Sequence, residues 1–153
     1  KINGAYQETE WRDKEGKELL WVKIMKRVIC AGTFDLLHTG HIKYLKEAKS
    51  LSDNSYLIII VARDSNSEKI KKKKTINNEG VRLARLKELD FVDEAVLGYE
   101  GNKFIQRVVS LNPDIIALGY DQWAKEEWLK KELESNGLNV QIVRMPKFDK
   151  VFL

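Results

Sequence analysis

From position 26 onward, short apolar runs alternate with segments in which apolar residues recur every three or four positions. The runs predict strands, and the periodic segments predict helices. The expected strands are 27–31, 56–62, 94–97, 114–118 and 140–143, and the expected helices are 39–51, 79–89, 102–111 and 124–135. Because strands that alternate with helices are typical of parallel sheets, we expect a doubly wound α/β domain with helices on both faces of a five-stranded parallel sheet.

Residues 1–25 do not follow this alternation. Acidic and basic side chains balance there, and residues 17–24 have some helical periodicity. Trp11 and Trp21 need a surface on which to pack. We interpret residues 1–25 as an N-terminal extension with helical character, which lies on the main domain (26–153) or on a second subunit. The remnant of another domain is the alternative.

The most distinctive segment lies between the first expected strand and the first expected helix. It reads Gly-Thr-Phe-Asp-Leu-Leu-His-Thr-Gly-His over residues 32–41. The first turn of a helix presents free backbone N–H groups and the positive end of the helix dipole, and both attract anions. His38 and His41 lie three residues apart, Gly40 allows close approach to the backbone, and Thr39 is the expected N-cap. The segment therefore predicts a phosphate site.

These residues resemble a known family. Gly-Thr-Phe-Asp followed by His-Thr-Gly-His is similar to the signature of the HxGH nucleotidyltransferases. The resemblance implies transfer of a nucleoside monophosphate from a nucleoside triphosphate to a phosphate-bearing acceptor, with release of pyrophosphate. It also implies a Rossmann-like sheet with strand order 3-2-1-4-5, so that the loops after the first and fourth strands share one crevice.

The resemblance assigns roles within residues 32–41. Gly32 and Thr33 would bring backbone N–H groups to the nucleotide phosphates, and Phe34 belongs to the same nucleotide-binding stretch. Asp35 would hold the motif or the metal–triphosphate, although a structural Asx turn is an alternative. The catalytic residues would include His38 and His41, which donate hydrogen bonds to the α- and β-phosphates, while Gly40 lets the phosphates approach.

Other assignments fall later in the chain. Lys74, in a lysine run at 69–74, would act on the phosphates as a third catalytic residue, and Arg82 would contact a phosphate. Thr75 stands where relatives tend to have proline, which puts the local geometry in question. In the loop after the fourth strand, the nucleotide would meet Gly119, Asp121 and Gln122, and Trp123 either stacks on a ring or packs against the following helix.

The choice of substrate depends on weaker patterns. Val-Ala-Arg-Asp at 61–64 and Leu-Gly-Tyr-Asp-Gln at 118–122 resemble archaeal-type FAD synthases, which move AMP from ATP to FMN. A cytidylyltransferase of the glycerol-3-phosphate type, using CTP, is the alternative. An adenylyltransferase acting on a sugar phosphate is a third.

Composition indicates the class of protein, its location and how it would use a metal ion. The 153 residues, 43% hydrophobic and 33% charged, suit one globular domain, and no apolar run approaches the ~20 residues of a membrane helix. The single cysteine, Cys30, excludes an internal disulfide and favours a cytoplasmic location. With two histidines and one distant cysteine we expect no protein-held metal site, only Mg²⁺ carried by the nucleotide.

Charge indicates small-molecule partners. The net charge is +4, and residues 65–90 hold eight basic and four acidic side chains. Because this excess is local and aromatic residues do not interleave with it, we expect no nucleic-acid partner. Homodimerisation is common in the resembled family and is expected here. A catalytically inactive relative would lack a motif histidine or lysine, and none is missing.

Overall fold

The computed structural model describes residues 25–149. All of the expected N-terminal extension except Met25 therefore lies outside the described residues. The elements are β1 (Lys26–Gly32), α2 (Thr39–Lys49), β2 (Ser55–Val61), α3 (Asp64–Lys71), α4 (Glu79–Lys87), β3 (Glu94–Leu97), α5 (Phe104–Leu111), β4 (Ile115–Leu118), α6 (Glu126–Ser135) and β5 (Gln141–Arg144).

The strands form one five-stranded sheet with the order β3-β2-β1-β4-β5, and every neighbouring pair is parallel. β1 lies at the centre, where Ile29 pairs with Ile58 on one side and with Ile116 on the other. The order reverses at β1, so the loops after β1 and β4 leave the same edge of the sheet side by side. The predicted fold class and strand order are confirmed.

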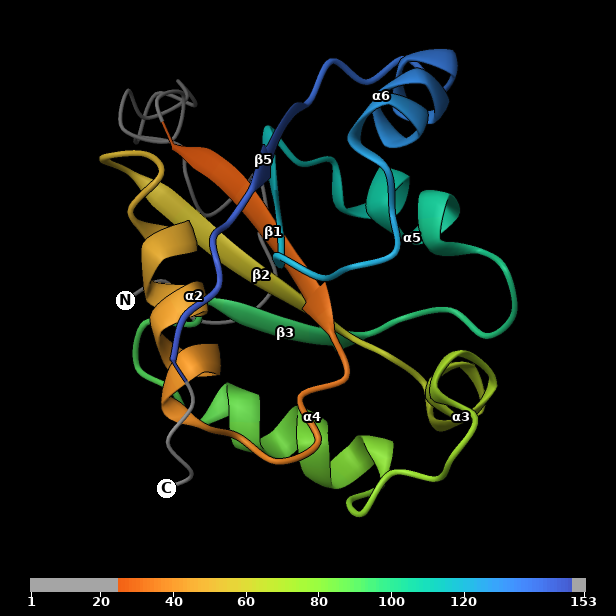
Figure 1. The fold of residues 1–153 in the computed structure, drawn as a ribbon. Coiled ribbons are helices and arrows are strands. Elements are labelled where there is room, and N and C mark those ends of the chain that lie inside the picture. Colours follow the sequence, from red (N-terminus) through yellow and green to blue (C-terminus); the bar gives the residue numbers. More distant parts are fainter. Residues whose placement is uncertain (1–24, 150–153) are drawn as a thin grey trace, which may run out of the picture.

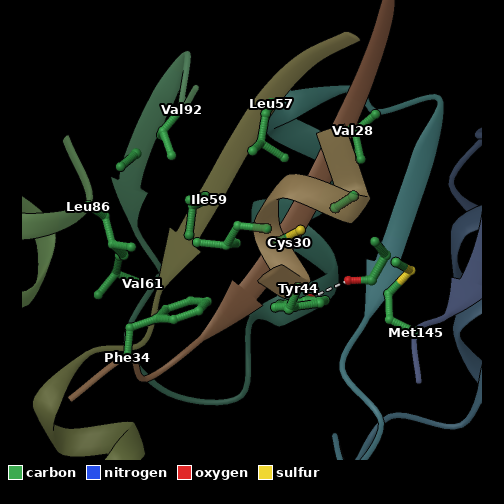
Figure 2. Close-up of a cluster of buried hydrophobic side chains, with 14 of the residues drawn as sticks. Val28, Cys30, Phe34, Tyr44, Leu57, Ile59, Val61, Leu86, Val92 and Met145 are labelled. Atoms are coloured by element: carbon green, nitrogen blue, oxygen red, sulfur yellow. Dashed lines mark hydrogen bonds between the residues drawn. The ribbon is translucent and has the colours of Figure 1, made fainter. Parts of the chain in front are cut away.

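Helices cover both faces of the sheet, as the doubly wound pattern predicts (Figure 1). Alternate residues of β1 point to opposite faces, because side chains alternate along a strand. Cys30 packs with Tyr44 of α2 and Leu86 of α4 in one buried cluster, part of which Figure 2 shows. Ile29 packs in the other with Val108 of α5 and Leu129 of α6. The core is thus two layers divided by the sheet.

The side chain of Tyr44 lies in the core layer that contains Cys30. Its hydroxyl donates a hydrogen bond to the carbonyl of Ala117 in β4 (Figure 2), so a polar group inside the core is satisfied. Cys30 lies beside it, and burial raises the pKa of the Cys30 thiol to about 12. Since the thiolate is the reactive form, Cys30 has the inert, structural character of a buried cysteine.

The sequence pattern missed one helix. α3 includes the first lysines of the run, which the pattern places in a loop. Its one fully buried side chain is that of Ser67, while Ile70 is exposed. A helix that buries no apolar stripe gives no periodic signal, and this is why α3 escaped prediction. Within residues 25–149, the helices are all too short or too polar to cross a membrane.

Candidate active site

One side chain joins the loop that follows β4 to the end of β1. Gln122 donates from Nε2 to the carbonyl oxygen of Ala31 over 2.6 Å, and its Oε1 accepts from the Gly119 N–H over 2.7 Å. The loop after β4 is therefore held against β1 at the point where the strand order reverses. Gln122 was predicted to touch the nucleotide, but the structure uses its amide to join this loop to β1.

The histidine pair begins α2. His38, rather than Thr39, is the N-cap, and its Nδ1 accepts a hydrogen bond from the His41 backbone N–H over 3.2 Å. The two rings stack with centroids 3.6 Å apart and an interplanar angle of 19°. Because Nδ1 is the acceptor, the neutral His38 ring carries its proton on Nε2, the atom that would donate to a phosphate.

Tight packing fixes the two imidazoles. The Phe34 ring lies edge-on to His41, with centroids 5.3 Å apart. A Cβ atom on Gly40 would lie 3.0 Å from the His38 ring, and one on Gly32 would lie 2.9 Å from the Phe34 ring. A side chain at either position would have to displace one of these rings. The Phe34 side chain belongs to the core and only 5% of it is exposed, which leaves its backbone alone to meet a nucleotide.

Asp35 ties the motif to the segment after the lysine run. Its carboxylate accepts hydrogen bonds from the backbone N–H groups of Ile76 and Asn77, each over 2.8 Å. In turn, Asn77 donates a hydrogen bond from Nδ2 to the carbonyl oxygen of Asp35. Burial raises the pKa of Asp35, but these N–H donors outweigh it and lower the pKa overall. The carboxylate thus holds the motif against residues 76 and 77, which is one of the roles expected for Asp35, and it does so without forming a local Asx turn.

Arg82 is the largest correction to the predicted site. Its side chain is fully buried in α4, where it donates to the carbonyl oxygens of Thr33 and Ala62 over 2.8 and 2.9 Å. It also donates to the carbonyl of Asn77 over 3.0 Å and to the Asp64 carboxylate over 2.6 Å. A guanidinium enclosed in this way joins four segments instead of meeting a phosphate. Sequence spacing placed the residue near the site but did not reveal where its side chain points.

The two helices that flank the lysine run cap each other. Asp64 at the start of α3 accepts from the Glu79 N–H, and Glu79 at the start of α4 accepts from the Asp64 N–H. Arg63 adds an ion pair to Glu79 over 2.9 Å. These three residues support the site, and the sequence interpretation assigned no role to any of them. Arg63 and Asp64 belong to Val-Ala-Arg-Asp at 61–64, which was used only to choose the substrate.

The lysine run forms an exposed basic projection between these two helix starts. Lys71 ends α3, and Lys72 adopts a left-handed conformation with φ of 57°. Lys74 is exposed and lies two residues before Ile76, whose N–H the Asp35 carboxylate holds. The projection is therefore anchored to the histidine motif, and its charge raises the local positive potential.

Arg144 of β5 holds the loop that follows β4. It donates to the carbonyl oxygens of Gly119, Gln122 and Ala124 over 2.7 to 3.0 Å. Asp121 within this loop is exposed. The sequence interpretation overlooked Arg144 because it lies 22 residues from the nearest predicted site residue. Within the described range 25–149, the structure contains no group of three histidine, cysteine, aspartate or glutamate side chains able to hold a metal ion.

Residues 29–152 match the sequence profile of a family described as cytidylyltransferase-like. This chain belongs to the cytidylyltransferase-like family. The match covers the histidine motif, the lysine run and the loop after β4, and so confirms the resemblance inferred from residues 32–41.

Individual proteins and a solved structure are similar to this chain over most of its length. The chain is 52% identical over 124 residues to a protein named FAD synthase from Korarchaeum cryptofilum, covering 80% of this chain and 83% of that protein. It is 47% identical to an FAD synthase from Thermoplasma volcanium, covering 82% and 85%. A crystal structure titled as the lipopolysaccharide core biosynthesis protein of Thermoplasma volcanium matches with a TM-score of 0.75 and 46% identity, covering 81% and 98%.

Proposed function

We propose that this protein transfers AMP from ATP to FMN, forming FAD and releasing pyrophosphate. A phosphate oxygen of FMN attacks the α-phosphorus of ATP, a new P–O–P linkage forms, and the bond to the β-phosphate oxygen breaks. Pyrophosphate leaves with that electron pair. The proposal draws on the cytidylyltransferase-like fold and on relatives of up to 52% identity that are named FAD synthase.

The observation that carries the proposal is the stacked pair His38 and His41 at the start of α2. Negative charge grows on the α-phosphate and on the departing pyrophosphate as the bond breaks. Donors that are already fixed stabilise that charge without reorganising, and the helix N-terminus adds its own N–H groups. No covalent enzyme intermediate is required, since the acceptor phosphate is the nucleophile.

The other predicted residues fall into two groups in this proposal. Gly32, Thr33 and Gly40 would bring the backbone near the phosphates, and Lys74 would neutralise charge on the triphosphate. Asp121, with the backbone of Gly119, would border the ribose or the base. Asp35, Arg82 and Gln122 would act as positioning residues, because their polar groups already bind protein atoms.

Mg²⁺ is part of the proposal as a companion of ATP. It would neutralise triphosphate charge. In the described part of the chain no cluster of three ligands is available to bind it, so the ion would be held mainly by phosphate oxygens and water. The Asp35 carboxylate accepts from backbone N–H groups, and the Asp64 carboxylate accepts from a backbone N–H and from Arg82, so both are already engaged.

The deciding experiment is pyrophosphate release with Mg²⁺, testing ATP and CTP against FMN, glycerol 3-phosphate and a sugar phosphate. Turnover with ATP and FMN supports the proposal. Turnover only with CTP and glycerol 3-phosphate would overturn it in favour of the cytidylyltransferase alternative. The sugar-phosphate arm tests the third alternative.

The expected homodimer and cytoplasmic location belong to this proposal as well. Light scattering of the purified chain tests the first, with a mass near twice 17.8 kDa as the expected result. Cell fractionation tests the second.

A further inference from the structure

Three aromatic side chains gather where α5 and α6 begin. The Phe104 and Trp123 rings meet edge to face with centroids 5.9 Å apart, and Trp123 lies 5.5 Å from Trp128 at a tilt of 52°. Trp123 is 54% exposed and Trp128 is 37% exposed. We call Phe104, Trp123 and Trp128 the aromatic cluster. The cluster presents a large ring surface to the outside of the molecule.

The topology places the aromatic cluster at the edge of the sheet from which the site loops leave. Helices that follow parallel strands begin at this carboxyl edge. Phe104 is the first residue of α5, and Trp128 is the third residue of α6. Trp123 directly follows Gln122, the residue that joins the loop after β4 to the end of β1. The cluster thus starts one residue away from that contact.

Trp123 packs against Phe104 and Trp128, yet 54% of it remains exposed. Large exposed aromatic surfaces next to a polar site are typical of ligand contacts. Lys103 and Lys125 are the N-cap residues of α5 and α6, and Glu126 and Glu127 occupy the first turn of α6. Charges of both signs thus lie close in sequence to the exposed rings, so a ligand would be held there by ring contact rather than by charge.

We propose that the aromatic cluster is the stacking surface for the flavin ring of the acceptor. The inference rests on the proposed function, in which the FMN phosphate must reach the α-phosphate held near His38 and His41. The ribityl chain then carries the flat three-ring isoalloxazine away from the phosphates along the edge of the sheet. A ring system of that size is bound by ring-on-ring contact with large aromatic side chains.

An adenine ring fits the aromatic cluster less well than a flavin. A base is selected through hydrogen bonds to its edge, and the exposed carboxylate of Asp121, in the loop that precedes Trp123, can accept such a bond.

The rival position for the flavin is a cleft of about 590 Å³ lined by Arg63, Tyr99, Glu100, Lys103 and Gln106. Four of these five side chains are charged or carry an amide. One face of its single ring, that of Tyr99, is already covered by the Arg107 guanidinium 4.8 Å away. This cleft suits a polar group better than a flat apolar ring, and it supplies a matched control.

The test is a titration of FMN with the full chain in the absence of ATP, following flavin fluorescence, which stacked tryptophan quenches. Trp123→Ala should weaken FMN binding about tenfold or more, the scale of one lost stacking contact. Trp123→Phe should recover part of that loss, and Tyr99→Ala should bind as the parent protein does. Unchanged circular dichroism and an unchanged KM for ATP confirm that the fold and the nucleotide side are intact.

Several results would overturn the inference. They are parent-like FMN binding by Trp123→Ala, loss of binding in Tyr99→Ala instead, or no FMN binding by the parent protein. In each of these cases pyrophosphate release with FMN would still support the proposed function. Conversely, FMN binding that depends on Trp123 but gives no pyrophosphate would uphold the stacking surface and reject the reaction.

Discussion

Replacing Arg82 with methionine removes a buried guanidinium while keeping most of the side-chain volume. The parent side chain is fully buried and donates to three backbone carbonyl oxygens, those of Thr33, Ala62 and Asn77. It also pairs with Asp64, whose side chain is 38% exposed. The variant therefore leaves three carbonyl groups without this donor and one carboxylate that water can reach.

Most of the expected loss in unfolding free energy comes from the three carbonyl groups. Removing a buried charged donor from its hydrogen-bond partners costs about 3–5 kcal/mol, and the exposed carboxylate of Asp64 adds little because solvent screens its charge. A loss of that size is a large share of the ~5–15 kcal/mol that stabilises a domain of this kind. Arg82→Lys keeps the charge but has three donors on one nitrogen, so we expect a smaller loss of about 2 kcal/mol.

Urea unfolding followed by circular dichroism measures the loss directly. Arg85→Met is the matched control, because Arg85 lies on the same helix and is exposed. We also expect Arg82→Lys to lower turnover about 10²-fold, since Thr33 and Asn77 would shift relative to the histidines. A loss of stability below about 1 kcal/mol in Arg82→Met, with turnover retained in Arg82→Lys, would refute the role assigned to the network.

Three further predictions follow from other contacts. His38→Asn should restore the N-cap of α2, so that it is about 1 kcal/mol more stable than His38→Ala, yet both should lose turnover; equal stability of the two would exclude the capping role. Gln122→Ala should cost about 1–2 kcal/mol in urea unfolding and raise the KM for ATP, whereas Asn136→Ala, exposed at the end of α6, should leave that KM unchanged. In the folded protein the pKa values of Asp35 and Asp64 are lowered, so the stabilisation from these carboxylates is present above the unfolded pKa of about 3.9 and is lost as the pH falls through the folded values. The unfolding free energy, measured from about pH 5 to about pH 2, should therefore fall less steeply with pH in Asp35→Asn than in the parent protein. Parallel curves for the two proteins would contradict this prediction.

The sequence was sufficient for the fold because the fold depends on patterns that are local. Buried strands read as continuous apolar runs, as in the strand over residues 55–61, and most of the helices bury an apolar stripe. α3 broke that rule, since it begins at a reciprocal pair of hydrogen bonds between Asp64 and Glu79 and buries no apolar stripe. No periodic signal marks a helix of this kind.

The position of the candidate site could be predicted from the sequence, but the role of each residue within it could not. Residues 32–41 indicated where a phosphate-binding turn is expected, because the residue types and their spacing themselves suggest that chemistry. The direction of a side chain depends on partners far away in the sequence. Arg82 turns toward carbonyls 5, 20 and 49 positions away, and Gln122 bonds to Ala31, 91 positions away. Such contacts become visible only in the folded chain.

The central claim is that the start of α2 is a preformed site for the phosphates, and single-turnover pyrophosphate release by His41→Ala tests it most directly. The measurement uses saturating ATP and FMN and a variant whose unfolding curve matches the parent. We predict a rate about 10²–10³ lower, the effect of removing one donor to the developing charge. An unchanged rate in a correctly folded His41→Ala protein would contradict the account.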